Sequence, residues 1–245
     1  MNATAPPLLE LEHVSKSFGA LKVMDDLSFT LALGEALGVL GPNGAGKSTM
    51  FNLVTGDARP DAGRVLFGGQ EITPLPPHAR CRAGISRSYQ IPHPFANLTV
   101  FENLLVGATF GGRRASGNDA DALCVDILGR TGLLPKANAL AGSLTLLERK
   151  RLELARALAT RPRLLLLDEI AGGLTEHECH ALVDTIRGVH ASGTTIVWIE
   201  HIVHALLAVV GRLIVLNFGR LIAEGPPAAV IASPEVRETY MGIEA

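Results

Sequence analysis

Cysteine is scarce in this sequence, and its few cysteines form no recognisable motif. The 245 residues include only Cys81, Cys124 and Cys179, whose spacing fits neither a zinc site nor a redox pair. We therefore predict free thiols in a reducing compartment. The segment HECH at 177–180 could suggest a metal site, but we interpret it as the acidic start of a helix that half-buries Cys179.

Long hydrophobic runs are also absent. No stretch is apolar over the roughly 18 residues that a membrane-spanning helix needs. The longest candidate, 205–216, is short and is interrupted by Arg212. The opening residues MNATAPPLLE lack the basic region and apolar run of a secretory signal. We expect a protein that does not cross a membrane itself but is free to dock on one.

The sequence has no surplus of positive charge. It contains 22 lysines and arginines against 24 aspartates and glutamates, for a formal net charge of -2. Nucleic-acid-binding domains are usually basic, so we expect no nucleic-acid partner. A hydrophobic content of 47% with 19% charged residues argues against disorder, and the length suits one compact domain or a core with an inserted lobe.

The order of apolar patterns predicts strands that alternate with helices, as in an α/β sheet. Predicted strands are 8–14, 27–33, 36–40, 64–67, 164–167 and 194–199, with a closing hairpin of 213–217 and 221–223. Predicted helices are 47–56, most of 100–134 with a break at 111–114, 144–160 and part of 226–245. The proline-rich segment 72–95 is predicted to be irregular. We expect the helix-rich middle to form a lobe inserted into the sheet.

The segment GPNGAGKST at 41–49 matches the complete pattern of a phosphate-binding loop between a strand and a helix. Glycines let backbone N–H groups approach phosphate oxygens, and the positive end of the following helix favours an anion. Lys47 would add charge at the β and γ phosphates, and the hydroxyl of Ser48 would hold Mg²⁺. We predict that ATP is bound by Gly41, Pro42, Asn43, Gly44, Ala45, Gly46, Lys47, Ser48 and Thr49.

Two carboxylates follow the predicted strand 164–167 and would supply the chemistry that a binding loop lacks. Ligands of open α/β folds lie at the carboxyl edge of the sheet, where we expect Asp168 and Glu169. Asp168 would orient Mg²⁺, largely through water, and Glu169 would accept a proton from the attacking water or position it. The sequence therefore predicts hydrolysis of ATP as well as binding.

With these motifs, the sequence resembles the nucleotide-binding subunits of ABC transporters over nearly the whole chain. The resemblance implies a P-loop NTPase core with a mixed sheet and an inserted α-helical subdomain. It also implies one domain over 1–245, with a core lobe of about 1–90 and 161–245 and a helical subdomain of about 91–160.

The resemblance gives roles to three further residues. Phe18 matches the aromatic residue that stacks on adenine in this family. Gln90 matches the glutamine that reaches Mg²⁺ and the attacking water, and His201 matches the histidine that contacts the γ-phosphate. The implied catalytic set is Glu169, His201 and Gln90, and the implied metal ligands are Ser48, Gln90 and Asp168.

Softer matches narrow the subfamily. The segments 95–104, 151–158, 171–174 and 223–226, with Pro234 and 240–242, look like importers of branched-chain amino acids. Subunits for urea, short amides or lipopolysaccharide export share much of this pattern. The resemblance implies two transmembrane permeases, a second ATPase subunit and, indirectly, a substrate-binding protein as partners. It places the chain at the cytoplasmic face of the inner (plasma) membrane.

Three other classes of protein are alternatives. A soluble ABC ATPase of translation or DNA repair usually has two cassettes or long coiled coils, whereas this chain has one cassette and no sustained heptads. A phosphotransferase gives no reason for Gln90, His201 and the long lobe. A nucleotide sensor that does not hydrolyse ATP is disfavoured by Glu169. We predict the energy-coupling subunit of a membrane importer, whose motion reaches the permeases through 90–104.

The sequence departs from the family in the signature segment, where LTLLE at 144–148 replaces LSGGQ. In the family this segment closes over ATP held by the partner subunit. Thr145 keeps a hydroxyl that could bond a γ-phosphate, but leucines replace both glycines and Glu148 replaces glutamine. Ile170 also replaces a usual proline, and Thr175 replaces aspartate or asparagine. Either the helix start still serves both sites, or the chain adds a weak signature to a heterodimer with unequal sites, and we favour the second.

Overall fold

The computed structural model describes residues 6–112 and 116–241. By its internal contacts the chain divides into two units. Unit 1 comprises Met1–Arg80, Val197–Ile199 and Val210–Ala245, and unit 2 comprises Cys81–Ile196 and Glu200–Val209. Strand β8 (Thr195–Ile199) contributes residues to both units. The bounds of units 1 and 2 differ from the bounds of the predicted core lobe and helical subdomain. The predicted division into these two lobes therefore remains a prediction.

An antiparallel sheet in unit 1 has the strand order β2-β1-β4-β5. Its strands are β2 (Leu21–Leu31), β1 (Leu9–Phe18), β4 (Ala62–Phe67) and β5 (Gln70–Glu71). In β1 the alternate residues Leu9 and Leu11 are buried, as the period of two in the predicted strand requires. β2 begins earlier than predicted because it pairs with β1 along most of its length.

The remaining strands of unit 1 include both parallel and antiparallel pairs. β3 (Ala36–Leu40) runs parallel to β9 (Arg212–Asn217), and β9 pairs antiparallel with β10 (Arg220–Gly225). These bounds confirm the predicted strand 36–40 and the predicted closing hairpin. Every residue of β3 is buried, as expected for an apolar strand that is covered on both faces.

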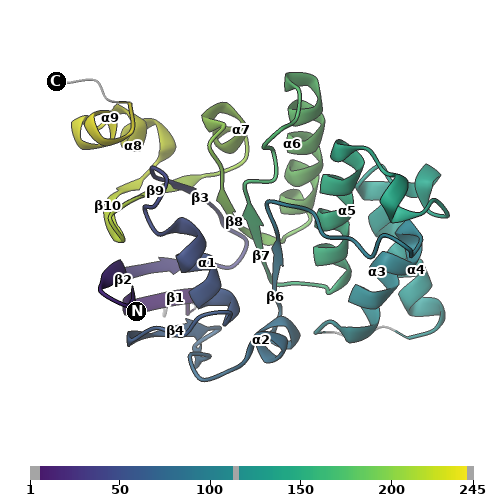
Figure 1. The fold of residues 1–245 in the computed structure, drawn as a ribbon, viewed down its shortest axis with the longest axis horizontal. Coiled ribbons are helices and arrows are strands. Elements are labelled where there is room, and N and C mark those ends of the chain that lie inside the picture. The colour runs from purple at the N-terminus through teal and green to yellow at the C-terminus, as the bar shows by residue number, and fades with distance from the viewer. Residues whose placement is uncertain (1–5, 113–115, 242–245) are drawn as a thin grey trace, which may run out of the picture. The chain divides into compact units, whose positions relative to one another are not determined.

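Helices accompany these strands in unit 1 as well. α1 (Lys47–Thr55) follows β3 and ends at Gly56, whose left-handed φ of 86° lets the helix stop where predicted. α8 (Pro227–Ala232) and α9 (Pro234–Met241) form the end of the chain that the structure describes. Both contact the β9–β10 hairpin, which Figure 1 shows beneath them. The predicted helical character of the tail is therefore confirmed.

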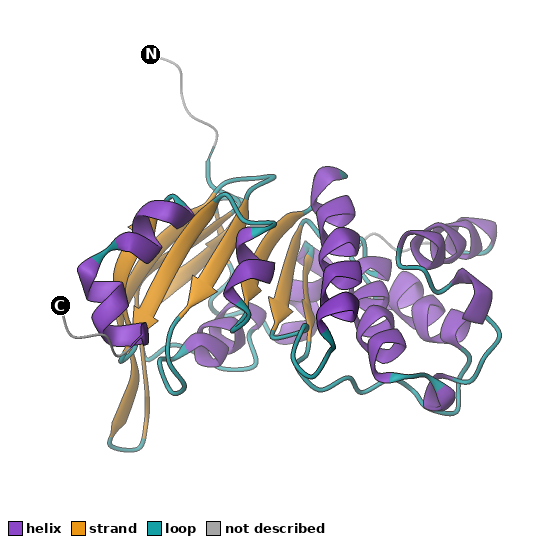
Figure 2. Ribbon diagram, turned by 90° about the horizontal axis from the view of Figure 1, so that it is seen from above, coloured by secondary structure: helices purple, strands orange, loops and turns teal. Residues whose placement is uncertain are grey.

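Unit 2 joins a short pair of parallel strands to a cluster of helices. The strands are β6 (Ile85–Ser88) and β7 (Leu164–Asp168). The clustered helices are α3 (Val100–Phe110), α4 (Asn118–Arg130) and α5 (Leu146–Ala159), which pack on one another in the helical group of Figure 2. The 3₁₀ turns η1 (Leu134–Lys136) and η2 (Ala141–Ser143) lead from α4 to α5, and α6 (Glu176–Ala191) and α7 (Val203–Leu207) follow later in the chain.

The prediction that 72–95 is irregular is wrong in two places, because the segment contains α2 (Pro77–Ala83) and β6. Proline is tolerated in the first turn of a helix, where its missing N–H breaks no bond, so Pro77 can begin α2. Arg80 of α2 is fully buried and donates to the carbonyl oxygens of Leu53 and Thr73 at 2.6 and 2.9 Å. Such long-range bonds stabilise a helix that the local pattern does not reveal.

Two smaller expectations can be compared with the helices. α6 begins at Glu176 and confirms a helix start at 177–180, although Cys179 is buried rather than half-buried. The predicted break at 111–114 follows α3, but Arg113 and Arg114 lie outside the described residues. Of the helices that the structure describes, none has the length and apolar character needed to span a membrane.

Candidate nucleotide-binding and catalytic site

The loop between β3 and α1 has a backbone that only glycine adopts easily. Gly41 and Gly46 have φ values of 154° and 100°, in the region that side chains disfavour. A Cβ atom on Gly46 would lie 2.8 Å from the carbonyl oxygen of Val23, and one on Gly41 would collide with the carbonyl oxygen of Leu216. Gly46 is also the N-cap of α1. The loop therefore ends at the start of this helix, where free N–H groups favour an anion.

Lys47 is held against this loop. Its side chain is buried, and its Nζ donates to the carbonyl oxygens of Gly41 and Pro42 at 2.7 and 3.0 Å. The ammonium therefore lies over the loop rather than extending into solvent. Ser48, the next residue of α1, is exposed, so its hydroxyl is open to a ligand. Lys47 and Ser48 thus place a cation and a hydroxyl at the start of α1, and their predicted role in phosphate binding remains a prediction.

Phe18 presents an exposed aromatic ring at the end of β1. The residue is 53% exposed, which is unusual for a large apolar side chain in a strand. The Nζ of Lys16 lies 5.4 Å from the centre of the ring. An exposed ring with a cation beside it can stack on a purine base, which is the role that the family resemblance implies for this residue.

Unit 2 brings together three side chains to which the sequence and the family resemblance assign catalytic roles. Glu169 directly follows β7 and has a φ of 46°, a left-handed conformation that is uncommon outside glycine. Its Oε2 accepts a hydrogen bond from Nε2 of Gln90 at 2.5 Å. Its Oε1 lies 2.6 Å from Nε2 of His201. Residues from three distant segments thus meet at one carboxylate.

Asp168 has a partner that the sequence analysis missed. The side chains of Asp168 and Arg87 are both 7% exposed, and Nη2 of Arg87 donates to Oδ2 of Asp168 at 2.5 Å. β6 and β7 are parallel neighbours, which brings Arg87 near the end of β7. The guanidinium also lies 4.9 Å from the ring centre of Tyr89. The sequence shows Arg87 only as a charged residue shortly before Gln90, and this does not reveal that it pairs with Asp168.

Two further buried charges beside Glu169 were also missed. Lys150 of α5 donates through Nζ to the carbonyl oxygens of Gln90 and Glu169 at 3.0 and 3.5 Å. Burial lowers the pKa of Lys150, whereas the negative charges of Glu200 and Glu169 oppose that shift. Glu200 is 1% exposed and accepts hydrogen bonds from the backbone N–H groups of His201 and Ala171 at 2.9 and 3.1 Å.

The variant signature segment forms the capped start of α5. Thr145 is the N-cap, and its hydroxyl accepts from the N–H of Glu148 at 3.4 Å. In return, Oε2 of Glu148 accepts from the N–H of Thr145 at 2.9 Å, and this bond lowers the pKa of Glu148. The charge of Glu148 is therefore directed back at its own helix start. Leu146, which stands in place of a glycine, is 45% exposed.

Comparison with known proteins covers nearly the whole chain. Residues 24–172 match the family model described as ABC transporter, and residues 220–245 match the one described as branched-chain amino acid ATP-binding cassette transporter. The high-affinity branched-chain amino acid transport ATP-binding protein LivG of Escherichia coli K12 is 35% identical over 251 residues, with 96% of this chain and 98% of LivG covered.

A second relative and a solved structure broaden this comparison. The Nod factor export ATP-binding protein I of Rhizobium johnstonii is 40% identical over 229 residues, with 93% of this chain and 72% of the relative covered. The ADP conformation of an ATP-binding cassette of an ABC transporter superposes with a TM-score of 0.88 at 31% identity, with 97% and 99% of the two chains covered. The predicted α/β fold with a mixed sheet is thereby confirmed.

Proposed function

The chain belongs to the ABC transporter family as an ATP-binding and ATP-hydrolysing subunit, and from this we propose that it powers the uptake of branched-chain or related amino acids. The observation that carries the proposal is the match of 220–245 to the branched-chain amino acid cassettes. This segment contains none of the predicted ATP-binding or catalytic residues. It therefore supports the subfamily separately from the motifs for hydrolysis.

In unit 1, the phosphates of ATP bind on the loop 41–49 and adenine stacks on the exposed ring of Phe18. The start of α1 directs N–H groups at the phosphates. Lys47 exchanges its present acceptors, the carbonyl oxygens of Gly41 and Pro42, for oxygens of the β and γ phosphates. The other residues of the loop act through their backbone, which the glycines allow to approach the phosphates.

Each unit has side chains that would serve as ligands of Mg²⁺, the hydroxyl of Ser48 in unit 1 and the oxygens of Gln90 and Asp168 in unit 2. Hydroxyl, amide and carboxylate oxygens are the ligands that this cation prefers. Gln90 uses its Nε2 for Glu169, so its Oε1 would be the ligand atom, and a carboxylate oxygen of Asp168 would be the second ligand in unit 2. When bound, Mg²⁺ neutralises charge on the β and γ phosphates.

Glu169 is the general base in this proposal. Its carboxylate accepts the proton of the attacking water, and the contacts from Gln90 and His201 hold it in one direction. His201 can direct its Nε2, which now faces Glu169, at the γ-phosphate. Gln90 would then continue to orient the base, whereas His201 would contact the γ-phosphate.

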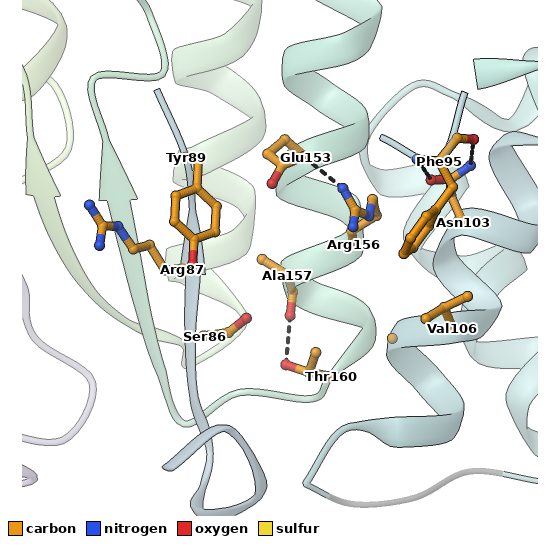
Figure 3. A pocket seen from close by; sticks show the side chains of 11 residues that line it. Ser86, Arg87, Tyr89, Phe95, Asn103, Val106, Glu153, Arg156, Ala157 and Thr160 are labelled. Carbon is orange, nitrogen blue, oxygen red and sulfur yellow. Dashed lines mark hydrogen bonds and ion pairs between the residues drawn. The ribbon is translucent and has the colours of Figure 1, made fainter. Parts of the chain in front are cut away.

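A pocket in unit 2 supports docking of the transmembrane permeases. It has a volume of about 190 Å³ and is lined by residues of β6, α3 and α5 and of the segments beside them. Figure 3 shows Tyr89 on one side, Phe95 on the other, and Glu153 with Arg156 between them. Phe95 and Tyr89 are 47% and 46% exposed. Exposed aromatic rings around a concave site suit a side chain inserted from the cytoplasmic face of a permease, on which this subunit would sit peripherally.

The signature segment bears on whether the chain pairs with a second ATPase subunit or with another copy of itself. We favour a heterodimer with a second ATPase subunit, because Leu146 and Leu147 restrict the backbone where the family has glycines. The capped start of α5, with Thr145 exposed, keeps the homodimer as the alternative. Purified chain that hydrolyses ATP alone as fast as it does with its partner would contradict the heterodimer.

Export is the second candidate function. It is favoured by the 40% identity to a Nod factor export ATP-binding protein, although that match covers 72% of the relative. An exported substrate would leave the cell without a substrate-binding protein. Import of an amino acid would instead require such a protein as an indirect partner. The two functions therefore differ in the direction of transport and in dependence on a binding protein.

Reconstitution in proteoliposomes tests the proposal. The chain is assembled with the two permeases and the second ATPase that this proposal requires, and uptake of radiolabelled leucine is measured with ATP and with the binding protein present or absent. We expect uptake that requires both ATP and the binding protein, and that is lost with Glu169→Gln. ATP hydrolysis without leucine uptake, or stimulation only by an exported substrate, would reject the import function.

A further inference from the structure

Two buried charges lie among the catalytic loops without belonging to the predicted catalytic set. Lys150 is 4% exposed and Glu200 is 1% exposed. Removing charges from water is unfavourable, so buried charges persist where bonds to them are well placed. What Lys150 and Glu200 bond to therefore indicates what each side chain does.

Lys150 joins the backbones of two catalytic residues. Its Nζ donates one hydrogen bond to the carbonyl oxygen of Gln90 at 3.0 Å and another to the carbonyl oxygen of Glu169 at 3.5 Å. The side chains of the same two residues bond to each other, Nε2 of Gln90 to Oε2 of Glu169 at 2.5 Å. The three residues therefore form a closed ring of hydrogen bonds. A shift of either backbone would strain the bond between the two side chains.

Glu200 joins the third catalytic residue to the segment after Glu169. Its Oε1 accepts from the N–H of His201 at 2.9 Å, and its Oε2 accepts from the N–H of Ala171 at 3.1 Å. Ala171 is two residues beyond Glu169, which has a strained backbone with a φ of 46°. The orientation of the Glu169 side chain therefore depends on how the residues after it are fixed. One buried carboxylate thus fixes the backbone on both sides of the contact between His201 and Glu169.

We propose that Lys150 and Glu200 are positioning residues for ATP hydrolysis. Together they hold the backbone at Gln90, Glu169 and His201, so that the carboxylate of Glu169 keeps a single orientation. Neither residue touches nucleotide in this proposal, and both act through Glu169. The inference rests on the proposed role of Glu169 as general base.

The test begins with Lys150→Met, which keeps an unbranched apolar stem and removes the donor. We expect kcat for ATP hydrolysis to fall by about 10²-fold, since small displacements of a catalytic group have effects of this size. KM and the equilibrium affinity for ATP should stay within about threefold, because the described contacts of Lys150 are inside unit 2 whereas the phosphate loop belongs to unit 1. Arg149→Met, at the exposed neighbouring position of α5, is the matched control and should keep kcat within about twofold.

A second variant separates positioning from charge balance. Lys150→Met alone takes a nearby positive charge away from the buried carboxylate of Glu200, whereas Lys150→Met with Glu200→Gln removes both charges. We expect the double variant to recover most of the thermal stability and to keep the low kcat. Recovery of kcat together with stability would show that the pair only balances charge, and would overturn the inference.

Glu169→Gln is measured beside these variants to distinguish two failures. If Glu169→Gln is inactive and Lys150→Met has the kcat of the unmodified chain, the positioning role is wrong and the base assignment stands. If Glu169→Gln hydrolyses ATP normally, the base assignment fails, and the positioning role fails with it. A loss of kcat in Lys150→Met that is matched by an equal loss of ATP affinity would also overturn the inference.

Discussion

The Nε2 atom of His201 lies 2.6 Å from Oε1 of Glu169. The other oxygen of that carboxylate accepts a hydrogen bond from Gln90 at 2.5 Å, so two segments of the chain hold it from two directions. The left-handed φ of Glu169 adds a strained backbone, of a kind that clusters at functional sites. A base that must meet one water molecule in one direction benefits from being fixed in this way.

Glu169→Gln should separate binding from hydrolysis. Glutamine has nearly the shape of glutamate but cannot accept the proton, so we expect turnover to fall by about 10² or more, as for loss of a general base. ATP binding should be unchanged, because the phosphate loop is intact. The measurements are phosphate release and equilibrium ATP binding, with Glu176→Gln at the exposed start of α6 as the control. Unchanged phosphate release in Glu169→Gln would mean that another group is the base.

Arg87→Met should mainly lower stability. It removes one partner of a buried ion pair and leaves the carboxylate of Asp168 in a site of low exposure. Breaking such pairs costs about 3 kcal/mol or more, so we expect the free energy of unfolding in urea to fall by about that amount. Arg82→Met, at an exposed position of α2, should change it by less than about 0.5 kcal/mol. Equal losses in the two variants would contradict a special role for the Arg87–Asp168 pair.

Local sequence patterns were sufficient where structure depends on near neighbours. The loop 41–49, the strand 36–40 before it and the stop of α1 at Gly56 were all predicted, since each depends on backbone preferences of consecutive residues. The same holds for the strand that ends at Asp168. The predicted roles of the site residues are not tested by these positions and remain proposals.

Other features could not be predicted because their causes are distant in sequence. The hydrogen-bond partners of three buried residues, Arg87, Lys150 and Glu200, lie on other segments, and no rule of sequence spacing predicts such contacts. The prolines of segment 72–95 predict irregular chain, whereas the hydrogen bonds of buried Arg80 that stabilise α2 are not visible in the sequence.

The capping boxes at the helix starts were missed for a different reason. In a capping box, the threonine before a helix and the glutamate three residues later bond to each other's backbone N–H groups. The pattern T-x-x-E that begins at Thr145 is visible in the sequence and indicates such a helix start.

Glycines in the signature segment should test the dimer partner. Leu146→Gly with Leu147→Gly restores the family's residues in the first turn of α5 and should lower stability by about 1–2 kcal/mol, because glycine disfavours helix. If the leucines weaken the signature, turnover by the isolated chain should rise while turnover by the heterodimer changes less. Phosphate release by the chain alone and with its partner is the measurement. No rise, with high activity of the unmodified chain alone, would favour two working sites in a homodimer.

The capping boxes predict a loss of stability in acid. The pKa values of Glu102, Glu148 and Glu178 are lowered from the ordinary 4.5, chiefly because each carboxylate accepts from the backbone N–H of the threonine that caps its helix. A folded-state pKa below the unfolded value means that this stabilisation is fully present above about pH 4.5 and is lost as the pH falls through the lowered values.

Melting temperature measured across this range tests that prediction. We expect it to fall as the pH drops below about 4.5, and to fall less steeply in the variant Glu102→Gln with Glu178→Gln, because those carboxylates no longer titrate. At neutral pH the same variant should be slightly less stable than the unmodified chain, since the neutral amide bonds the helix start more weakly than the carboxylate does. Glu238→Gln at an exposed position of α9 is the control. An acid slope that is the same in all three proteins would show that other groups determine the loss of stability.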